Sequence, residues 1–232
     1  MSNPFFRFKQ FTVYHDLCAM KVGVDGVLLG AWANCRNAQF ALDVGTGSGL
    51  IALMLAQRSE ALIHAIDIDE NACKQAEINF NNSPFRNRLN IEHVDFQNFS
   101  SSIRYDLIVS NPPYFVHSLK SPDTNRNLAR HNEFLPLEVL IKKSASLLSP
   151  QGKAAFILPF DRWKAVNSLA IENQLFLCRK TDVSSLQNYP PKRILLEYSH
   201  IKQDVKEDNF YIGKTKQTYS NEYRALTEDF YL

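Results

Sequence analysis

The chain has 232 residues, of which 45% are hydrophobic, and a formal net charge of +2, so it can bury one sizeable core. No apolar run approaches the roughly 20 residues that span a bilayer, and Arg7 and Lys9 stand where a signal peptide needs its apolar core. Four widely spaced cysteines argue against a disulfide scaffold. We expect a cytoplasmic protein in which residues 1–232 form a single domain, with short appendages at 1–38 and 201–232.

The ionisable residues carry two further expectations. The histidines and cysteines lack the spacing of metal ligands, so we expect no metal. Residues 39–114 contain five Lys and Arg against nine Asp and Glu, so the surplus positive charge lies elsewhere in the chain. An acidic half suits a cationic ligand and a basic remainder suits a polyanion, although ordinary scatter of solvated charges explains the asymmetry equally well.

The N-terminal residues alternate between aromatic and polar side chains. Residues Phe5–Phe11, interrupted by Arg7 and Lys9, predict a half-buried strand, although aromatic rings among cations can also stack on nucleic-acid bases. The glycine-rich turn Lys21–Gly26 then leads into an apolar helix, Val27–Ala33. We expect this helix to lie over the edge of a ligand pocket.

A strand, a glycine loop and a helix follow in direct succession. The strand Gln39–Val44 enters a loop with glycine at 45, 47 and 49, and the helix Leu50–Gln57 leaves it. A dinucleotide loop of the type G-x-G-x-x-G would need glycine in place of Leu50. Asp43 instead gives the pattern D-x-G-x-G-x-G, which suits the ammonium and sulfonium groups of S-adenosylmethionine. We therefore predict that Asp43, Gly45, Gly47 and Gly49 bind this cofactor.

Two further strands are expected to end in cofactor-binding residues. The strand Ala61–Ile66 leads to Asp67, in the position where nucleotide-binding sheets place an acceptor for the ribose hydroxyls. Asp69 fits the alternative role of a helix N-terminal charge, because the helix Asn71–Asn81 begins after it. The strand Leu89–Val94 is followed by Asp95 and Phe96, for which we predict contacts with the adenine amino group and the adenine face.

The fourth strand, Tyr105–Ser110, ends at Asn111-Pro112-Pro113-Tyr114. Proline donates no backbone hydrogen bond, so the Asn111 side chain and the Pro112 carbonyl offer two fixed acceptors, and Tyr114 adds a ring. Together they can hold a planar group that carries an NH2, such as adenine. The tetrapeptide could also be only a turn. Its place at the same sheet edge as the glycine loop favours a catalytic role for Asn111, Pro112 and Tyr114.

The remaining chain predicts a basic loop followed by four more strands. Phe115–Glu133 contains Lys120, Arg126 and Arg130 without periodicity, which is typical of a functional loop. The elements expected after it are a helix Pro136–Leu148 stopped by Pro150 and Gly152, a strand Lys153–Leu158, a helix capped by Asp161 and running through Ile171, strands Leu175–Thr181 and Ile194–Tyr198, an edge strand Phe210–Ile212 and a closing helix Glu222–Thr227.

These motifs resemble those of class I S-adenosylmethionine-dependent methyltransferases that act on amino groups. The flanking segments are similar to those of the bacterial tRNA1(Val) adenine-37 N6-methyltransferase family, and the resemblance covers nearly the whole chain. The segments that carry it are Phe8-Lys9-Gln10-Phe11, Met20-Lys21-Val22-Gly23, Asp25-Gly26-Val27-Leu28-Leu29-Gly30-Ala31-Trp32 and Leu226-Thr227-Glu228-Asp229-Phe230-Tyr231-Leu232.

The resemblance implies an α/β fold with a doubly wound, Rossmann-like seven-stranded sheet in the order 3-2-1-4-5-7-6 and one antiparallel strand. It implies an enzyme that uses S-adenosylmethionine to methylate N6 of adenosine 37 in tRNA(Val), next to the anticodon, and we expect the protein to be a monomer. Three alternatives stay open: an N-methyltransferase for another RNA or DNA amino group, a release-factor glutamine methyltransferase, and a non-catalytic nucleotide-binding module. A release-factor glutamine methyltransferase normally has a helical domain before the glycine loop. The roughly 40 residues that precede the loop in this chain leave little room for one.

Overall fold

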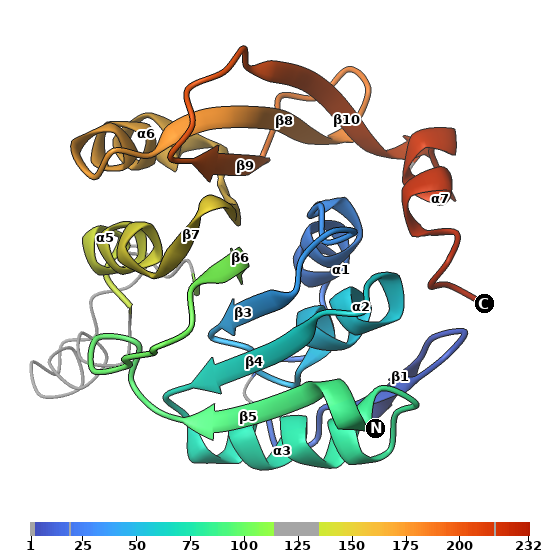
Figure 1. The fold of residues 1–232 in the computed structure, drawn as a ribbon. Helices are drawn as coiled ribbons and strands as arrows, with labels where there is room; N and C mark the ends of the chain where they lie inside the picture. The colour runs from blue at the N-terminus through green and yellow to red at the C-terminus, as the bar shows by residue number, and fades with distance from the viewer. Residues whose placement is uncertain (1–2, 19, 114–134, 216) are drawn as a thin grey trace, which may run out of the picture.

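The computed structural model describes residues 3–18, 20–113, 135–215 and 217–232 (Figure 1). Within these residues, a nine-stranded sheet runs in the order β11-β10-β8-β9-β7-β6-β3-β4-β5. Its strands are β3 (Phe40–Val44), β4 (Leu62–Asp67), β5 (Leu89–His93), β6 (Tyr105–Ser110), β7 (Leu148–Pro159), β8 (Phe176–Leu186), β9 (Arg193–Ser199), β10 (Lys206–Thr215) and β11 (Thr218–Tyr219).

The first strand of this sheet along the chain, β3, lies between β6 and β4. Numbered along the chain from β3, the strands β3 to β9 lie in the order 3-2-1-4-5-7-6. β9 runs antiparallel to both β7 and β8, and the strands β3 to β7 pair in parallel. The predicted α/β class is confirmed. The seven expected strands are present with β9 antiparallel. β10, which contains the expected edge strand Phe210–Ile212, extends the sheet beside β8, and β11, which was not expected, pairs antiparallel with β10.

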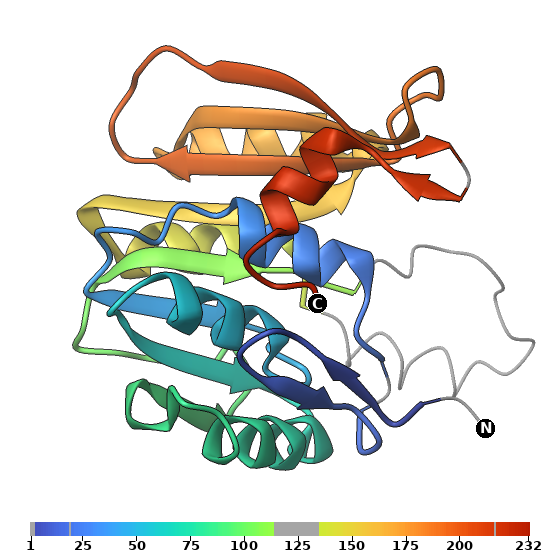
Figure 2. The same cartoon turned by 90° about the vertical axis from the view of Figure 1, so that its right-hand side faces the viewer.

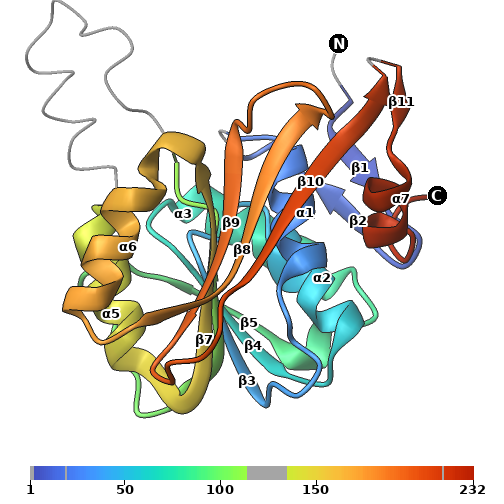
Figure 3. The same ribbon diagram turned by 90° about the horizontal axis from the view of Figure 1, so that it is seen from above.

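Helices cover both faces of the sheet (Figure 3). Successive residues of β6 show why both faces need cover: Leu107 and Val109 enter one buried cluster and Ile108 enters the other. Among the described residues, no helix combines the length and apolar composition that crossing a bilayer requires. The helices are α1 (Val24–Trp32), α2 (Leu50–Arg58), α3 (Glu70–Asn81), α5 (Leu137–Leu147), α6 (Trp163–Glu172) and α7 (Asn221–Thr227).

The two ends of the chain pack against each other (Figure 2). The N-terminal segment forms a hairpin of β1 (Phe5–Arg7) and β2 (Thr12–Tyr14), where the sequence predicted one strand. Between these strands, the Lys9 backbone N–H donates to the Phe230 carbonyl at 2.8 Å, and the Phe8 ring stacks on Tyr231 with centroids 5.9 Å apart. The hairpin is thus held by the last residues of the chain.

Two predicted boundaries around β7 and α6 were wrong. β7 begins at Leu148 and runs through the residues expected to form a turn, because an irregularity in its register with β6 accommodates them. Gly152 is needed there, since a Cβ atom would lie 2.5 Å from the Tyr105 carbonyl oxygen. Asp161 lies inside a short 3₁₀ turn, and α6 starts only at Trp163 without a side-chain cap.

Candidate active site

The carboxyl ends of three neighbouring strands form the site. In the sheet register, Val44 is opposite Ile66 on one side and Ser110 on the other. The Ser110 hydroxyl, which is fully buried, donates to the Val44 carbonyl at 2.8 Å and joins β6 to β3 at their last residues. The loops that leave these strands therefore start next to one another.

The glycine loop has a backbone conformation that residues with a side chain rarely adopt. Gly45, Gly47 and Gly49 have φ angles of 70°, 55° and 80°, in the left-handed region. A Cβ atom at either of the first two would meet nothing within 4 Å, whereas one at Gly49 would lie 2.4 Å from the Phe80 ring. The first two glycines thus face open space in which a ligand can approach the backbone, and the third permits α2 and α3 to pack closely.

Asp43 lies beneath this loop and is fully buried. Its Oδ2 accepts hydrogen bonds from the Thr46 hydroxyl at 2.6 Å and the Ala52 N–H at 3.1 Å. Its Oδ1 is buried and has no hydrogen-bond partner among the described residues. Burial, together with the nearby Asp67 charge, raises the pKa of Asp43 to about 7 against the lowering effect of these two hydrogen bonds. The carboxyl group ties the loop together and leaves one acceptor unused.

The raised pKa of Asp43 predicts a pH dependence of stability. Because the folded state holds this proton more tightly than the unfolded chain, stability should fall as pH rises from about 4 through 7 in the absence of cofactor. The Asp43→Asn variant should show a flatter profile of melting temperature between about pH 4 and 8. Asp161→Asn, an exposed change, is the control. A variant slope as steep as that of the wild type would contradict the prediction.

Asp67 connects the glycine loop to the start of α3. Its Oδ2 accepts from the Gly47 N–H at 2.8 Å and its Oδ1 accepts from the Asp69 N–H at 2.9 Å. Burial raises the pKa of Asp67, and these backbone donors oppose that rise. Asp69 is the N-cap of α3 and accepts from Asn71, as the sequence predicted. Within the described ranges, no group of three or more His, Cys, Asp and Glu side chains is placed to hold a metal ion.

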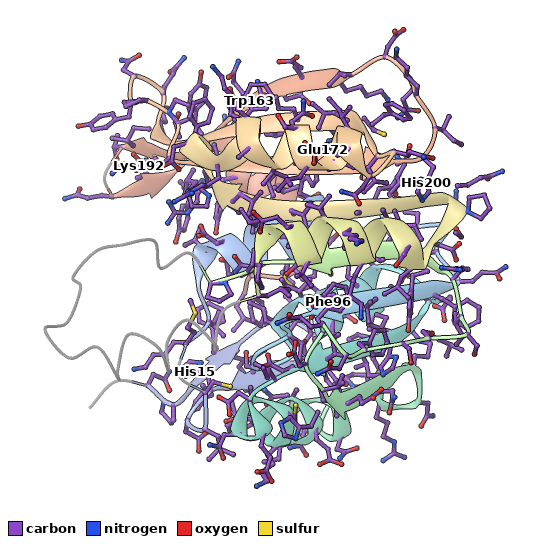
Figure 4. All side chains as sticks on the ribbon, turned by 90° about the vertical axis from the view of Figure 1, so that its left-hand side faces the viewer. His15, Phe96, Trp163, Glu172, Lys192 and His200 are labelled. Carbon is purple, nitrogen blue, oxygen red and sulfur yellow. The ribbon has the colours of Figure 1, made fainter. Side chains whose placement is uncertain are left out.

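Asp95 and Phe96 lie in the turn that follows β5. The Asp95 carboxylate accepts from the Gln97 N–H at 2.8 Å. Phe96 is only 4% exposed and packs beside Phe99 within the core (Figure 4). Lys143 of α5, which no sequence pattern indicated, donates to the carbonyls of Gln97 and Phe99 and lies 5.5 Å from the Phe96 ring. The turn is therefore rigidly held, and the adenine contacts of Asp95 and Phe96 stay predictions.

Asn111 and Pro112 follow β6 directly. Asn111 is half-buried and Pro112 is buried, so both stand at the sheet edge beside the glycine loop. Tyr114 and the basic segment that contains Lys120, Arg126 and Arg130 lie outside the described residues.

A pair of buried amides on α3 fixes the N-terminal segment beside the site. Asn79 is fully buried; its Nδ2 donates to the carbonyls of Ser48 and Tyr14, both at 2.8 Å, and its Oδ1 accepts from the Tyr14 N–H. Gln75, one turn earlier, accepts from the Leu17 N–H at 2.9 Å. Asn79 thus joins the glycine loop to the N-terminal segment. The signal for it in the sequence is two amide side chains four residues apart on the inward face of a helix.

The links made by Asn79 predict an effect on cofactor binding. Asn79→Ala leaves the Ser48 and Tyr14 backbone groups without this partner, so the loop becomes less ordered before binding. We expect the Kd for S-adenosylmethionine, measured by calorimetry, to rise by about three- to tenfold, with little change in kcat. The control is Asn81→Ala, which removes an exposed amide from the same helix. Equal Kd values for the two variants would refute a positioning role.

Comparison with known proteins agrees with this geometry. Residues 26–158 match the methyltransferase small domain family. The chain is 50% identical to the tRNA1(Val) (adenine(37)-N6)-methyltransferase of Parabacteroides distasonis, over 100% of this chain and 99% of that protein. The chain belongs to the family of the tRNA1(Val) (adenine(37)-N6)-methyltransferases. The matched 26–158 region contains every residue described above at the sheet edge except the N-terminal segment.

Solved structures show how widely this fold is shared. A predicted O-methyltransferase from Agrobacterium tumefaciens superposes with a TM-score of 0.69 at 13% identity, covering 89% of this chain and 96% of that one. A glycopeptide N-methyltransferase, solved with S-adenosyl-L-methionine, has a TM-score of 0.53 at 11% identity, covering 70% of this chain and 87% of its own. At these identities the likeness concerns the fold alone.

Proposed function

We propose that this protein transfers a methyl group from S-adenosylmethionine to N6 of adenosine 37 in tRNA(Val), next to the anticodon. The structural observation that carries the proposal is the pairing of Val44 with Ser110, which makes the glycine loop and Asn111 leave the sheet side by side. The relatives named for this reaction match the chain over its full length. A cofactor loop and an amine-binding motif are both needed for it, and here they share one edge.

The described residues fit the cofactor. The open space at Gly45 and Gly47 admits a ligand to the backbone, and Asp43, with its unused acceptor Oδ1, lies directly beneath that backbone. We assign Asp67 to the ribose hydroxyls, and Asp95 with Phe96 to adenine. S-adenosylmethionine, when bound, supplies an electrophilic methyl group on a sulfonium.

The motif after β6 would prepare the target amine. The lone pair of an adenine amino group is delocalised into the ring, so the nitrogen is a poor nucleophile. If Asn111 Oδ1 and the Pro112 carbonyl each accept one N–H, they favour a pyramidal nitrogen whose lone pair is directed at the methyl group. Tyr114 would stack on the base. The nitrogen needs no strong base before attack, because it releases its proton after the methyl group has arrived. An anticodon loop also exposes adenosine more easily than a duplex does.

The proposal is tested by nucleoside mass spectrometry of tRNA(Val) from a strain that lacks this protein. We expect N6-methyladenosine to disappear from position 37 and to return when the purified protein and S-adenosylmethionine are added to that tRNA. A transcript with guanosine at position 37 is the control and should accept no methyl group. A tRNA(Val) that keeps its N6-methyladenosine in the deletion strain refutes the assignment.

A further inference from the structure

A groove lies beyond β9, away from the cofactor loop. It has a volume of about 420 Å³ and is formed by the β8–β9 connection and the β10–β11 hairpin. Tyr189 and Tyr219 line it and are 47% and 50% exposed. Polar groups of Ser185, Gln217 and Thr218 also line it, and its lining contains no carboxylate. No residue of this groove takes part in the reaction proposed above.

The groove opens at the same edge of the sheet as the active site. β8 pairs in parallel with β10, and both run in the direction of β6, since β9 is antiparallel to β7 and β8. Their carboxyl ends therefore lie at the edge where Asn111 follows β6. In the sheet, β8 is three strands from β6, which corresponds to roughly 15 Å. Figure 4 shows Lys192 at the end of the molecule that carries His15, opposite His200.

Ion pairing links the groove to the active-site elements. Arg193, next to Lys192 at the beginning of β9, donates from Nε to Asp25 in the first turn of α1 at 2.7 Å. α1 in turn packs against α2, the helix that leaves the glycine loop; a Cβ atom at Gly26 would lie 3.0 Å from Leu50. A series of contacts between packed residues thus connects the two places.

The chemistry of the groove suits single-stranded RNA. Exposed tyrosine rings stack on bases, and hydroxyl and amide groups hydrogen-bond to base edges or to the 2′-hydroxyl. Lys192 adjoins the β8–β9 connection and Lys214 adjoins the hairpin; both are exposed, and neither forms an ion pair within the described part of the chain. A phosphate backbone that crossed this edge would meet two exposed lysines in the same two segments that carry the tyrosine rings.

We propose that this groove is a second RNA site, which binds an unstacked nucleotide of the tRNA substrate while its target adenosine occupies the active site. This inference rests on the proposed function. It adds a recognition element outside the reaction centre, held between the β8–β9 connection and the β10–β11 hairpin. Binding there would hold the anticodon loop open and orient it relative to Asn111.

The test measures the tRNA affinity of the full-length protein by fluorescence anisotropy without cofactor. Tyr189→Ala should raise the Kd for tRNA by about tenfold, whereas Tyr189→Phe should restore it, because base stacking needs the ring and not the hydroxyl. The Kd for S-adenosylmethionine should stay unchanged in both variants, which shows that the active site is intact. Tyr189 lies in an exposed connection, so its truncation spares the core.

The charge contribution is tested by salt dependence. The double variant Lys192→Ala with Lys214→Ala should reduce the slope of log Kd against log salt by about two units. The matched control is Lys202→Ala with Lys206→Ala; these exposed lysines lie at the opposite edge, after β9 and at the start of β10. Equal slopes in the two double variants, or an unchanged tRNA Kd in Tyr189→Ala, overturn the proposal.

These outcomes are separable from failure of the proposed function. A wild-type protein that binds tRNA but leaves adenosine 37 unmethylated refutes the reaction, while the effect of Tyr189→Ala on binding still stands. Conversely, a protein that methylates adenosine 37 with the same KM for tRNA in Tyr189→Ala as in the wild type refutes the groove and leaves the reaction in place.

Discussion

Replacing Asn111 by alanine should lower kcat by about 10²-fold or more, while affinity for S-adenosylmethionine stays within a few-fold of the wild type. The reason is that the Asn111 amide oxygen would be one of only two acceptors that turn the adenine amino group into a nucleophile. Its loss should raise the free energy of the transition state far more than it weakens cofactor binding, because the cofactor loop follows another strand. Single-turnover kinetics with tRNA and calorimetry with the cofactor separate the two effects.

Two further variants delimit the role of Asn111. Asn111→Asp keeps an acceptor oxygen, so its kcat should fall between those of alanine and the wild type. Asn90→Ala removes an exposed amide from β5 and should leave kcat unchanged. Near-wild-type turnover in Asn111→Ala would remove this residue from the mechanism.

The second large effect is expected for Asp67→Ala. The Asp67 carboxylate has two tasks: it would accept from the ribose hydroxyls, and it already accepts from the Gly47 N–H. Loss of hydrogen bonds to a charged group should weaken cofactor binding by roughly 1.5 to 3 kcal/mol, as measured by calorimetry. The identity of the methylated nucleoside should not change.

Asp69→Ala is the matched comparison for Asp67, two residues away. Asp69 caps α3, so its loss should lower the free energy of unfolding by about 1 kcal/mol and leave cofactor affinity alone. If calorimetry finds full affinity in Asp67→Ala and weakened binding in Asp69→Ala, the ribose contact belongs to Asp69.

Local patterns in the sequence predicted most of the central sheet, because its strands are short apolar runs with clear ends. β6 has the predicted bounds, and α3 begins one residue before the expected start. The errors lie where distant contacts decide the structure. β7 continues through Pro150 because β6 can pair with it across a register shift, and β11 exists only because β10 is there to pair with it.

The residues of the site fall into the same two groups: those that local patterns predict and those whose roles depend on distant contacts. The glycine spacing and the residues that end each strand were readable, since parallel strands bring their carboxyl ends to one edge. The roles of Asn79 and Lys143 could not be predicted, because each depends on which backbone carbonyls lie near the side chain in the folded chain. The groove at Tyr189 likewise combines two segments about 30 residues apart, and nothing in either alone indicates it.

The contact of the N-terminal hairpin with Phe230 and Tyr231 affects the order in which parts of the structure form during synthesis. Phe8 and Lys9 are made long before their partners Phe230 and Tyr231, which follow more than 220 residues later. At about 5–20 residues per second, the N-terminal hairpin waits for tens of seconds before its supporting surface exists. Because that hairpin continues into the segment held by Asn79 beside the glycine loop, the cofactor site reaches its final form only after Phe230 and Tyr231 have been added. A nascent chain that still lacks these residues leaves the Phe8 ring without its stacking partner Tyr231.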